Sequence, residues 1–133
     1  MAGDPGLVRE WLVKAQSDFR TAERLLETQP ALRDTGCFHC QQAVEKLLKG
    51  FLLHHGVATP KVHVLGMLFD LCEPVESVVG ALRNDCEPLA RFAVEVRYPG
   101  GPLPSVARAA AALTAMRTAW KVVLDRLPPE VRP

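Results

Sequence analysis

The chain has 133 residues, of which 48% are hydrophobic and 23% charged, a composition that indicates one globular domain and excludes a disordered protein. Sixteen basic and fifteen acidic residues leave a net charge of +1, so no general attraction to nucleic acid is indicated and no DNA partner is expected. No apolar run reaches the ~20 residues that span a bilayer, and no secretory signal is visible. We therefore expect a single domain over residues 1–133, with its core at about 8–127, located in the cytoplasm and without a membrane partner.

Proline and glycine residues divide the chain into five segments with the apolar periodicity of α-helices. The first, Val8–Leu26, carries apolar residues three and four apart and ends before Pro30. The second begins at Asp34 or Thr35, which are both good N-caps, and runs to about residue 55. Gly56 follows at the position where glycine often ends a helix.

The last three segments complete an all-α pattern. The third is short, at Val64–Cys72. The fourth, Val75–Val96, contains Pro88, so we expect a kink or a break near Asp85. The fifth is Val106–Leu127. Nothing shows the alternation of a strand, and short connections between helices favour antiparallel neighbours. The sequence therefore predicts an up-and-down helical bundle of four long helices plus one short helix.

The second segment carries a polar stripe beside its apolar one. Gln42, Glu45, Lys46 and Lys49 follow one another at i, i+3, i+4 and i+7, which places them on one side of a helix. From spacing alone, the simplest interpretation is a solvated face with a weak Glu45–Lys49 pair, worth a few tenths of a kcal/mol.

The same segment carries a family resemblance. Residues 40–50, CQQAVEKLLKG, closely resemble the hallmark helix of HEPN domains, small helical domains named for higher eukaryotes and prokaryotes nucleotide-binding. Residues 62–68, VHVLGML, look like the family's short segment in which a histidine precedes spaced leucines, and residues 97–99 look like its Arg-Tyr-Pro signature. Residues 11–22 are similar to the family's first helix with its aspartate. The four matches occur in the family's order and cover about residues 8–126.

The resemblance implies a bundle commonly paired as a homodimer, with a polar cleft in which eight side chains converge. These are Asp18, Gln42, Glu45, Lys46, Lys49, His63, Arg97 and Tyr98. In such a cleft the lysines and Arg97 would hold phosphate oxygens, and Tyr98 would stack on a base or donate its hydroxyl. Glu45 or Asp18 would orient the lysines, and His63 would titrate near neutral pH. The alternative is a structural network of ion pairs that locks the helices together.

Many HEPN proteins resemble metal-independent ribonucleases, whose motif is an arginine, four to six residues and a histidine late in the domain. No histidine follows Arg83 or any later arginine, since the last histidine is His63. One formal match, Arg33 with His39, straddles the entry to the second helix, where the family does not place its catalytic pair. We therefore predict no catalytic residues and favour a binding module over a ribonuclease.

The four cysteines are expected to be free core residues, because cytosolic thiols stay reduced. Cys37 and Cys40 share a helix face, but a structural zinc site needs four ligands and no second Cys/His pair stands at zinc-finger spacing. We therefore expect no metal site and no cofactor.

Three functional hypotheses follow. The leading one is a nucleotide- or partner-binding HEPN module associated with a minimal nucleotidyltransferase, as in two-component or toxin–antitoxin pairs. The second is a metal-independent RNase toxin that uses a non-standard site, including His63 or the Arg33 and His39 pair. The third is a purely structural dimerisation domain, with the second helix as its interface.

Overall fold

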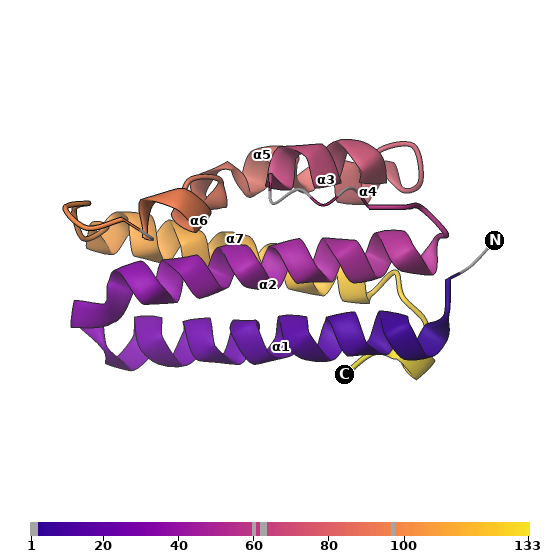
Figure 1. The fold of residues 1–133 in the computed structure, drawn as a ribbon, viewed down its shortest axis with the longest axis horizontal. Coiled ribbons are helices and arrows are strands. Elements are labelled where there is room, and N and C mark those ends of the chain that lie inside the picture. The colour runs from indigo at the N-terminus through magenta and orange to yellow at the C-terminus, as the bar shows by residue number, and fades with distance from the viewer. Residues whose placement is uncertain (1–2, 60, 62–63, 97) are drawn as a thin grey trace.

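The computed structural model describes residues 3–59, 61, 64–96 and 98–133. Over these ranges the chain is helical and contains no strand, which confirms the predicted all-α bundle. Figure 1 shows α1 and α2 side by side and antiparallel, α7 behind α2, and the short helices α3 to α6 above α2. The helices are α1 (Pro5–Thr28), α2 (Arg33–His54), α3 (Leu65–Cys72), α4 (Ser77–Gly80), α5 (Leu82–Asp85), α6 (Phe92–Glu95) and α7 (Val106–Leu124), with 3₁₀ turns at Pro30–Leu32, Glu87–Leu89 and Pro129–Val131.

Helix α1 begins and ends where its sequence indicates. The side chain of Asp4 caps its first turn by accepting from the backbone N–H of Gly6 at 3.1 Å, and Pro5 occupies the first helical position. The helix stops at Thr28, two residues before Pro30, because proline disfavours helical backbone in the residue that precedes it.

Helix α2 begins differently from the prediction. The 3₁₀ turn at Pro30–Leu32 runs directly into the helix, so that Asp34 and Thr35 already lie in its first turn. Their prediction as N-caps is wrong; the Asp34 carboxylate instead accepts from the backbone N–H of Thr35 at 2.8 Å. The carboxyl end agrees with the sequence, since Gly56 follows the last turn with a φ of +72° and Val57 N–H reaches back to the carbonyl oxygen of Leu52 at 2.9 Å.

Helices α1 and α2 approach each other along small residues of α2 that are seven apart: Gly36, Ala43 and Gly50. A Cβ atom added at Gly36 would lie 2.6 Å from Cδ2 of Leu26, and one added at Gly50 would lie 3.1 Å from Cδ2 of Leu12. We call this line of contact the α1–α2 seam. A Cβ atom at either glycine would therefore displace a leucine side chain of α1.

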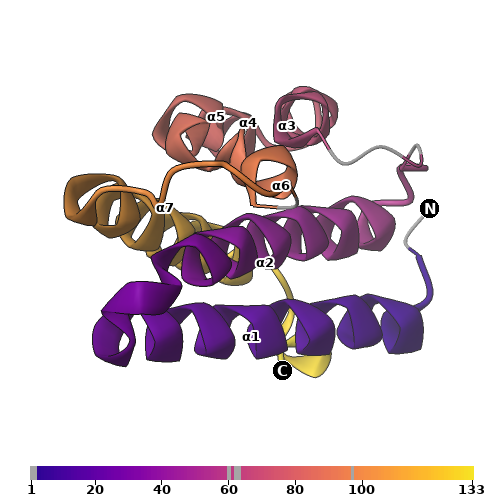
Figure 2. The same cartoon turned by 60° about the vertical axis from the view of Figure 1, so that its left-hand side comes forward.

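The core lies between α1, α2 and α7 and under the short helices, as Figure 2 shows from a second direction. Its largest fully buried apolar side chains come from every layer of the fold: Phe51, Phe69, Phe92, Leu12, Leu47, Leu48, Leu52, Leu68, Leu89 and Met116. All four cysteines are buried and free, as predicted. Burial raises the pKa of Cys37 to about 11 and those of Cys72 and Cys86 to about 12.

The fourth predicted segment forms short pieces, and the expected break near Asp85 is confirmed. Helix α5 ends at that residue, and Pro88, which has no N–H to donate, lies in the 3₁₀ turn that follows. The backbone of Gly80, the last residue of α4, lies close to that of Glu73, since an added Cβ would be 2.7 Å from Cα of Glu73. Each short piece still buries at least one apolar side chain against the core, including Val79, Leu82, Leu89 and Phe92.

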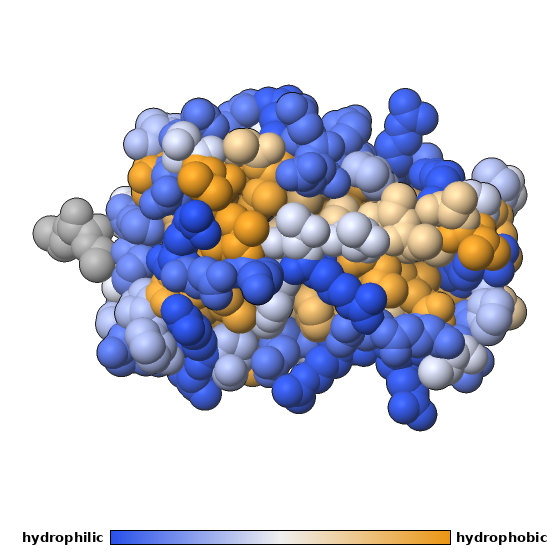
Figure 3. All heavy atoms as spheres, turned by 180° about the vertical axis from the view of Figure 1, so that it is seen from behind, coloured by the Kyte–Doolittle hydropathy of each residue, from blue (hydrophilic) through white to orange (hydrophobic). Residues whose placement is uncertain are grey.

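Viewed from behind, the molecule shows an apolar and neutral band between charged margins (Figure 3). The exposed face of α7 lies on this side and is built from small residues, namely Ala107, Ala110, Ala111, Thr114 and Thr118. None of the described helices is both long enough and apolar enough to cross a membrane.

Candidate functional site

Asp18 on α1 is the centre of a polar cluster in the α1–α2 seam. Its residue is 9% exposed, and both carboxylate oxygens have partners on α2. Oδ1 lies 2.8 Å from Nδ1 of His39, and Oδ2 accepts from Nζ of Lys46 at 2.6 Å. His39 and Lys46 are seven residues apart and therefore lie on the same side of α2. We call Asp18, His39 and Lys46 the seam cluster.

The chemistry of the seam cluster follows from its hydrogen bonds. A carboxylate oxygen only accepts, so Nδ1 of His39 is the donor, and Nε2 is the nitrogen available to accept or to take up a proton. The side chains of His39 and Lys46 are each 27% exposed. The cluster therefore buries its negative charge and presents an imidazole and an ammonium group at the surface. That arrangement suits an anionic ligand.

A second set of polar side chains, the buried polar row, runs along α2 at four-residue intervals: Gln41, Glu45 and Lys49. These residues are 1%, 3% and 9% exposed. Lys49 Nζ lies 3.4 Å from Glu45 Oε2, and Gln41 Nε2 donates to Glu45 Oε1 over 3.4 Å. At the Gln41 end of the row, Nε2 of Gln42 donates to Oε1 of Gln41 at 2.7 Å. The solvated-face interpretation of Glu45 and Lys49 is therefore wrong.

One aromatic ring connects the buried polar row to α1. The ammonium group of Lys49 lies over the ring of Trp11, 5.6 Å from its centroid, within the range of a cation–π interaction. This contact gives Lys49 a second interaction besides Glu45 and keeps its charge on the side of α2 that faces the first turns of α1.

Five of the predicted site residues thus lie along α1 and α2. They are Asp18, Gln42, Glu45, Lys46 and Lys49. Tyr98 does not join them in the described structure. It is 67% exposed and lines a small hollow with Asp34, at the opposite end of α2 from Lys49. The other two predicted residues, His63 and Arg97, lie outside the described residues.

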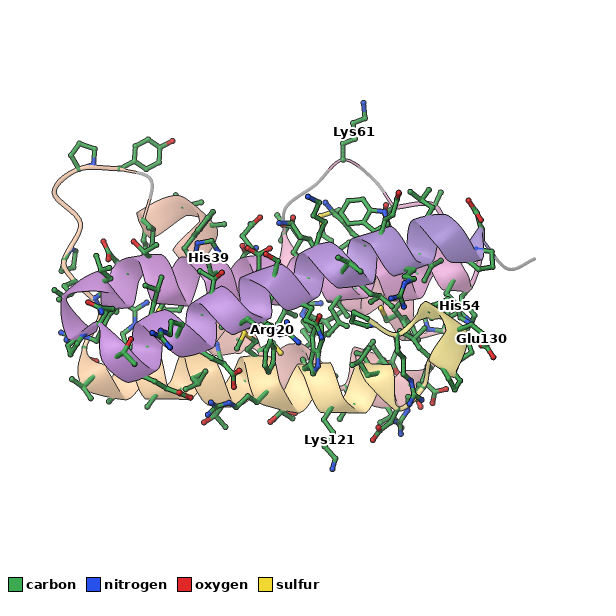
Figure 4. The ribbon with its side chains drawn as sticks, turned by 90° about the horizontal axis from the view of Figure 1, so that it is seen from below. Arg20, His39, His54, Lys61, Lys121 and Glu130 are labelled. Carbon is green, nitrogen blue, oxygen red and sulfur yellow. The ribbon has the colours of Figure 1, made fainter. Side chains whose placement is uncertain are left out.

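His39, Gln41 and Trp11 belong to this site and are not among the predicted residues. His39 lies between Cys37 and Cys40 in the sequence, and this pattern of cysteine and histidine is typical of a metal site. The sequence signal for His39 is its separation of seven residues from Lys46. At that separation both side chains lie on the same side of α2 and can reach one aspartate on a neighbouring helix. In Figure 4, His39 lies toward the side from which Lys61 projects, while Lys121 points away from the opposite side.

The formal Arg33 and His39 pair does not form one site. Arg33 donates from Nε to the carbonyl oxygen of Pro104 and from Nη1 to that of Pro30, both at 2.9 Å. Its guanidinium thus ties the start of α2 to the connection that precedes α7, while His39 turns toward Asp18. Within the part of the chain that the structure describes, no group of three or more histidine, cysteine, aspartate or glutamate side chains is arranged to hold a metal ion.

Comparison with known proteins identifies the family of the chain. The family model described as the HEPN domain matches residues 8–126, nearly the whole chain. Neither the curated proteins nor the solved structures gave a significant match. The chain is all-helical over its described residues, and the match spans the helices from α1 to α7. It belongs to the HEPN domain family.

Proposed function

We propose that this protein is a nucleotide-binding HEPN module that performs no chemistry of its own, and that its ligand lies on the seam cluster. The observation that supports this function is the burial of three charged residues of α1 and α2, Asp18, Glu45 and Lys49, each at 9% exposure or less. Removing ionised groups from water costs several kcal/mol for each group, and well-packed apolar residues would stabilise the fold as well or better. A binding role explains why the charges are retained.

In this proposal the phosphate of the ligand contacts the exposed nitrogens of the seam cluster. Lys46 Nζ offers donors beyond the one that Asp18 accepts, and His39 Nε2 donates when the imidazole is protonated. Asp18 holds both side chains in place and screens their mutual repulsion. The buried polar row sets the position of α2 behind them.

A thermal-shift experiment tests the binding function. We expect ATP, GTP or AMP at millimolar concentration to raise the melting temperature of the wild-type protein, because a ligand that binds only the folded state stabilises it. Lys46→Ala is expected to abolish the shift. Lys121→Ala is the matched control, since this lysine is exposed and points away from the other side of the molecule. Absence of a shift across the nucleotide panel would overturn the function.

We further propose that the module acts as a homodimer and associates with a minimal nucleotidyltransferase, which supplies the chemistry in a two-component or toxin–antitoxin pair. Membership of the HEPN family supports this proposal. Light scattering of the purified protein measures the mass, and a dimer is the expected result. Co-expression with a small nucleotidyltransferase encoded beside this gene should yield a complex. A monomer that fails to retain such a partner would contradict the proposal.

A metal-independent RNase is the second candidate function, and the Asp18–His39 hydrogen bond favours it. A histidine oriented by a carboxylate, with its other nitrogen exposed, has the arrangement of a general base, here acting on a ribose 2′-OH. Lys46 would then stabilise the charged phosphorane. Incubation of pure protein with RNA in the presence of EDTA decides the matter: cleavage that is lost in His39→Ala supports the RNase, and intact RNA removes it.

A further inference from the structure

Four residues of α1 form a line that leads away from the seam cluster. Leu7, Trp11, Lys14 and Asp18 are four, three and four residues apart, which places them on one face of the helix. Along the axis, Trp11 precedes Asp18 by ~10 Å and Lys14 lies between them. A ligand held at Asp18 and its partners can therefore extend along this face toward the amino-terminal end of α1.

A hollow lies at the far end of that line. It has a volume of about 550 Å³, is open to solvent and is lined by residues of α1 alone: Gly6, Leu7, Arg9, Glu10, Trp11, Val13 and Lys14. This volume falls in the range of small-molecule sites, which are mostly apolar with a few polar groups. Leu7 is 44% exposed and Val13 is 45% exposed, so the apolar lining is accessible from solvent. We call this feature the Trp11 hollow.

The Trp11 hollow is connected to the candidate site through Lys49. The ring of Trp11 contributes to the hollow and also carries the ammonium group of Lys49 at 5.6 Å from its centroid. Lys14 adds an exposed positive charge that has no ion-pair partner among the described residues. An aromatic ring in an apolar hollow, followed by cations along one helix face, matches the order of chemical groups in a nucleoside phosphate.

We propose that the Trp11 hollow is the base subsite of the protein. The nucleobase stacks against Trp11 between Leu7 and Val13, the sugar lies along Lys14, and the phosphate contacts Lys46 and His39. This inference rests on the proposed nucleotide-binding function and adds to it: the ligand is a nucleoside phosphate recognised at both ends, and not a phosphate group alone.

Tryptophan fluorescence tests the subsite. The chain has two tryptophans, and the other one, Trp120, packs on Phe19 with ring centroids 4.8 Å apart. Trp120→Phe keeps an aromatic ring there and leaves Trp11 as the single reporter. We expect AMP to change the emission of Trp11 and to bind at least about tenfold more tightly than ribose 5-phosphate, because one stacked base contributes about this much.

Two variants of Trp11 separate stacking from folding. Trp11→Leu keeps an apolar side chain but removes the ring, and it should bring the affinity for AMP down to that for ribose 5-phosphate. Trp11→Phe should retain part of the preference, and Lys121→Ala all of it. Equal binding of both ligands by the wild-type protein would overturn the base subsite and leave phosphate binding intact. If neither ligand binds, the nucleotide-binding function fails and the subsite fails with it.

Discussion

His39 donates its Nδ1–H to Oδ1 of Asp18 at 2.8 Å, and this bond joins the two long helices at a point where the carboxylate is 9% exposed. The second oxygen of the same carboxylate accepts from Lys46. One aspartate on α1 thus determines how two side chains of α2 are presented to solvent. We therefore expect both the stability of the seam and the proposed binding function to depend on it.

Replacing Asp18 should destabilise the fold measurably. Asp18→Ala removes the acceptor of two charge-assisted hydrogen bonds and leaves the Lys46 ammonium group without its counter-ion, so we expect a loss of about 1–3 kcal/mol in the free energy of unfolding. Urea denaturation measures it, with Asp85→Ala, an exposed aspartate on α5, as the matched control. In a double-mutant cycle, Asp18→Ala and His39→Ala should couple by at least about 0.5 kcal/mol. Strict additivity would contradict the interaction.

The pair formed by Glu45 and Lys49 should contribute far more than a surface pair. Its side chains are 4% and 10% exposed, and breaking a buried pair costs about 3 kcal/mol because a charge stays buried. Lys49→Met keeps the aliphatic stem beside Trp11 and removes the charge. The comparison is Arg83→Ala, which breaks a pair with Asp70 whose side chains are 51% and 60% exposed and should cost less than about 1 kcal/mol.

Urea denaturation of both variants gives the comparison directly. If Lys49→Met lowers the free energy of unfolding by no more than Arg83→Ala does, the Glu45 carboxylate is not destabilised when the lysine charge is removed.

Alkaline pH should destabilise the protein through its thiols. Burial raises the pKa of Cys37 from 9.0 to about 11 and those of Cys72 and Cys86 to about 12. Between these values and 9.0 the folded state holds protons that the unfolded state has released, so stability falls as pH rises. We expect a constant urea midpoint up to about pH 8 and a steady decline from pH 9 toward pH 11. Cys72→Ala should reduce the slope, and an unchanged slope would contradict the assignment.

Gly36→Ala should destabilise the seam even though alanine favours helices by about 1 kcal/mol. The added methyl group would lie 2.6 Å from Cδ2 and 2.8 Å from Cγ of Leu26, so the Leu26 side chain must leave its position or the helices must move apart, at a cost of about 1–3 kcal/mol. Gly6→Ala on α1 is the control, because its Cβ meets only the Asp4 carboxylate at 3.6 Å and 3.8 Å. Thermal unfolding should show a lower midpoint for Gly36→Ala alone.

Much of the fold could be predicted because three segments are long and strongly periodic. Those segments became α1, α2 and α7. The predicted start of α2 at Asp34 or Thr35 was wrong, since capping preferences do not show that a preceding 3₁₀ turn continues into the helix. The fourth segment was predicted to break near Asp85, but its further division into α4, α5, a 3₁₀ turn and α6 was not predicted, because its apolar periodicity continues across these breaks.

The site was predictable to a smaller extent. Asp18 and Lys46 were expected in one cleft, and they form an ion pair at 2.6 Å. The burial of Glu45 was not foreseen, because a stripe at helical spacing has the same pattern whether solvent or another part of the chain covers it. His39 was considered together with Arg33, and its contact with Asp18 on another helix was not foreseen.

The small residues of the α1–α2 seam have a consequence for how the site can change. Asp18 reaches both of its partners on α2 because Gly36, Ala43 and Gly50 leave the two helices close together. A substitution that widens this seam would lengthen both bonds from Asp18. If the proposed ligand binds at the seam cluster, its affinity would then depend on helix spacing, and a substitution far from the ligand would weaken binding.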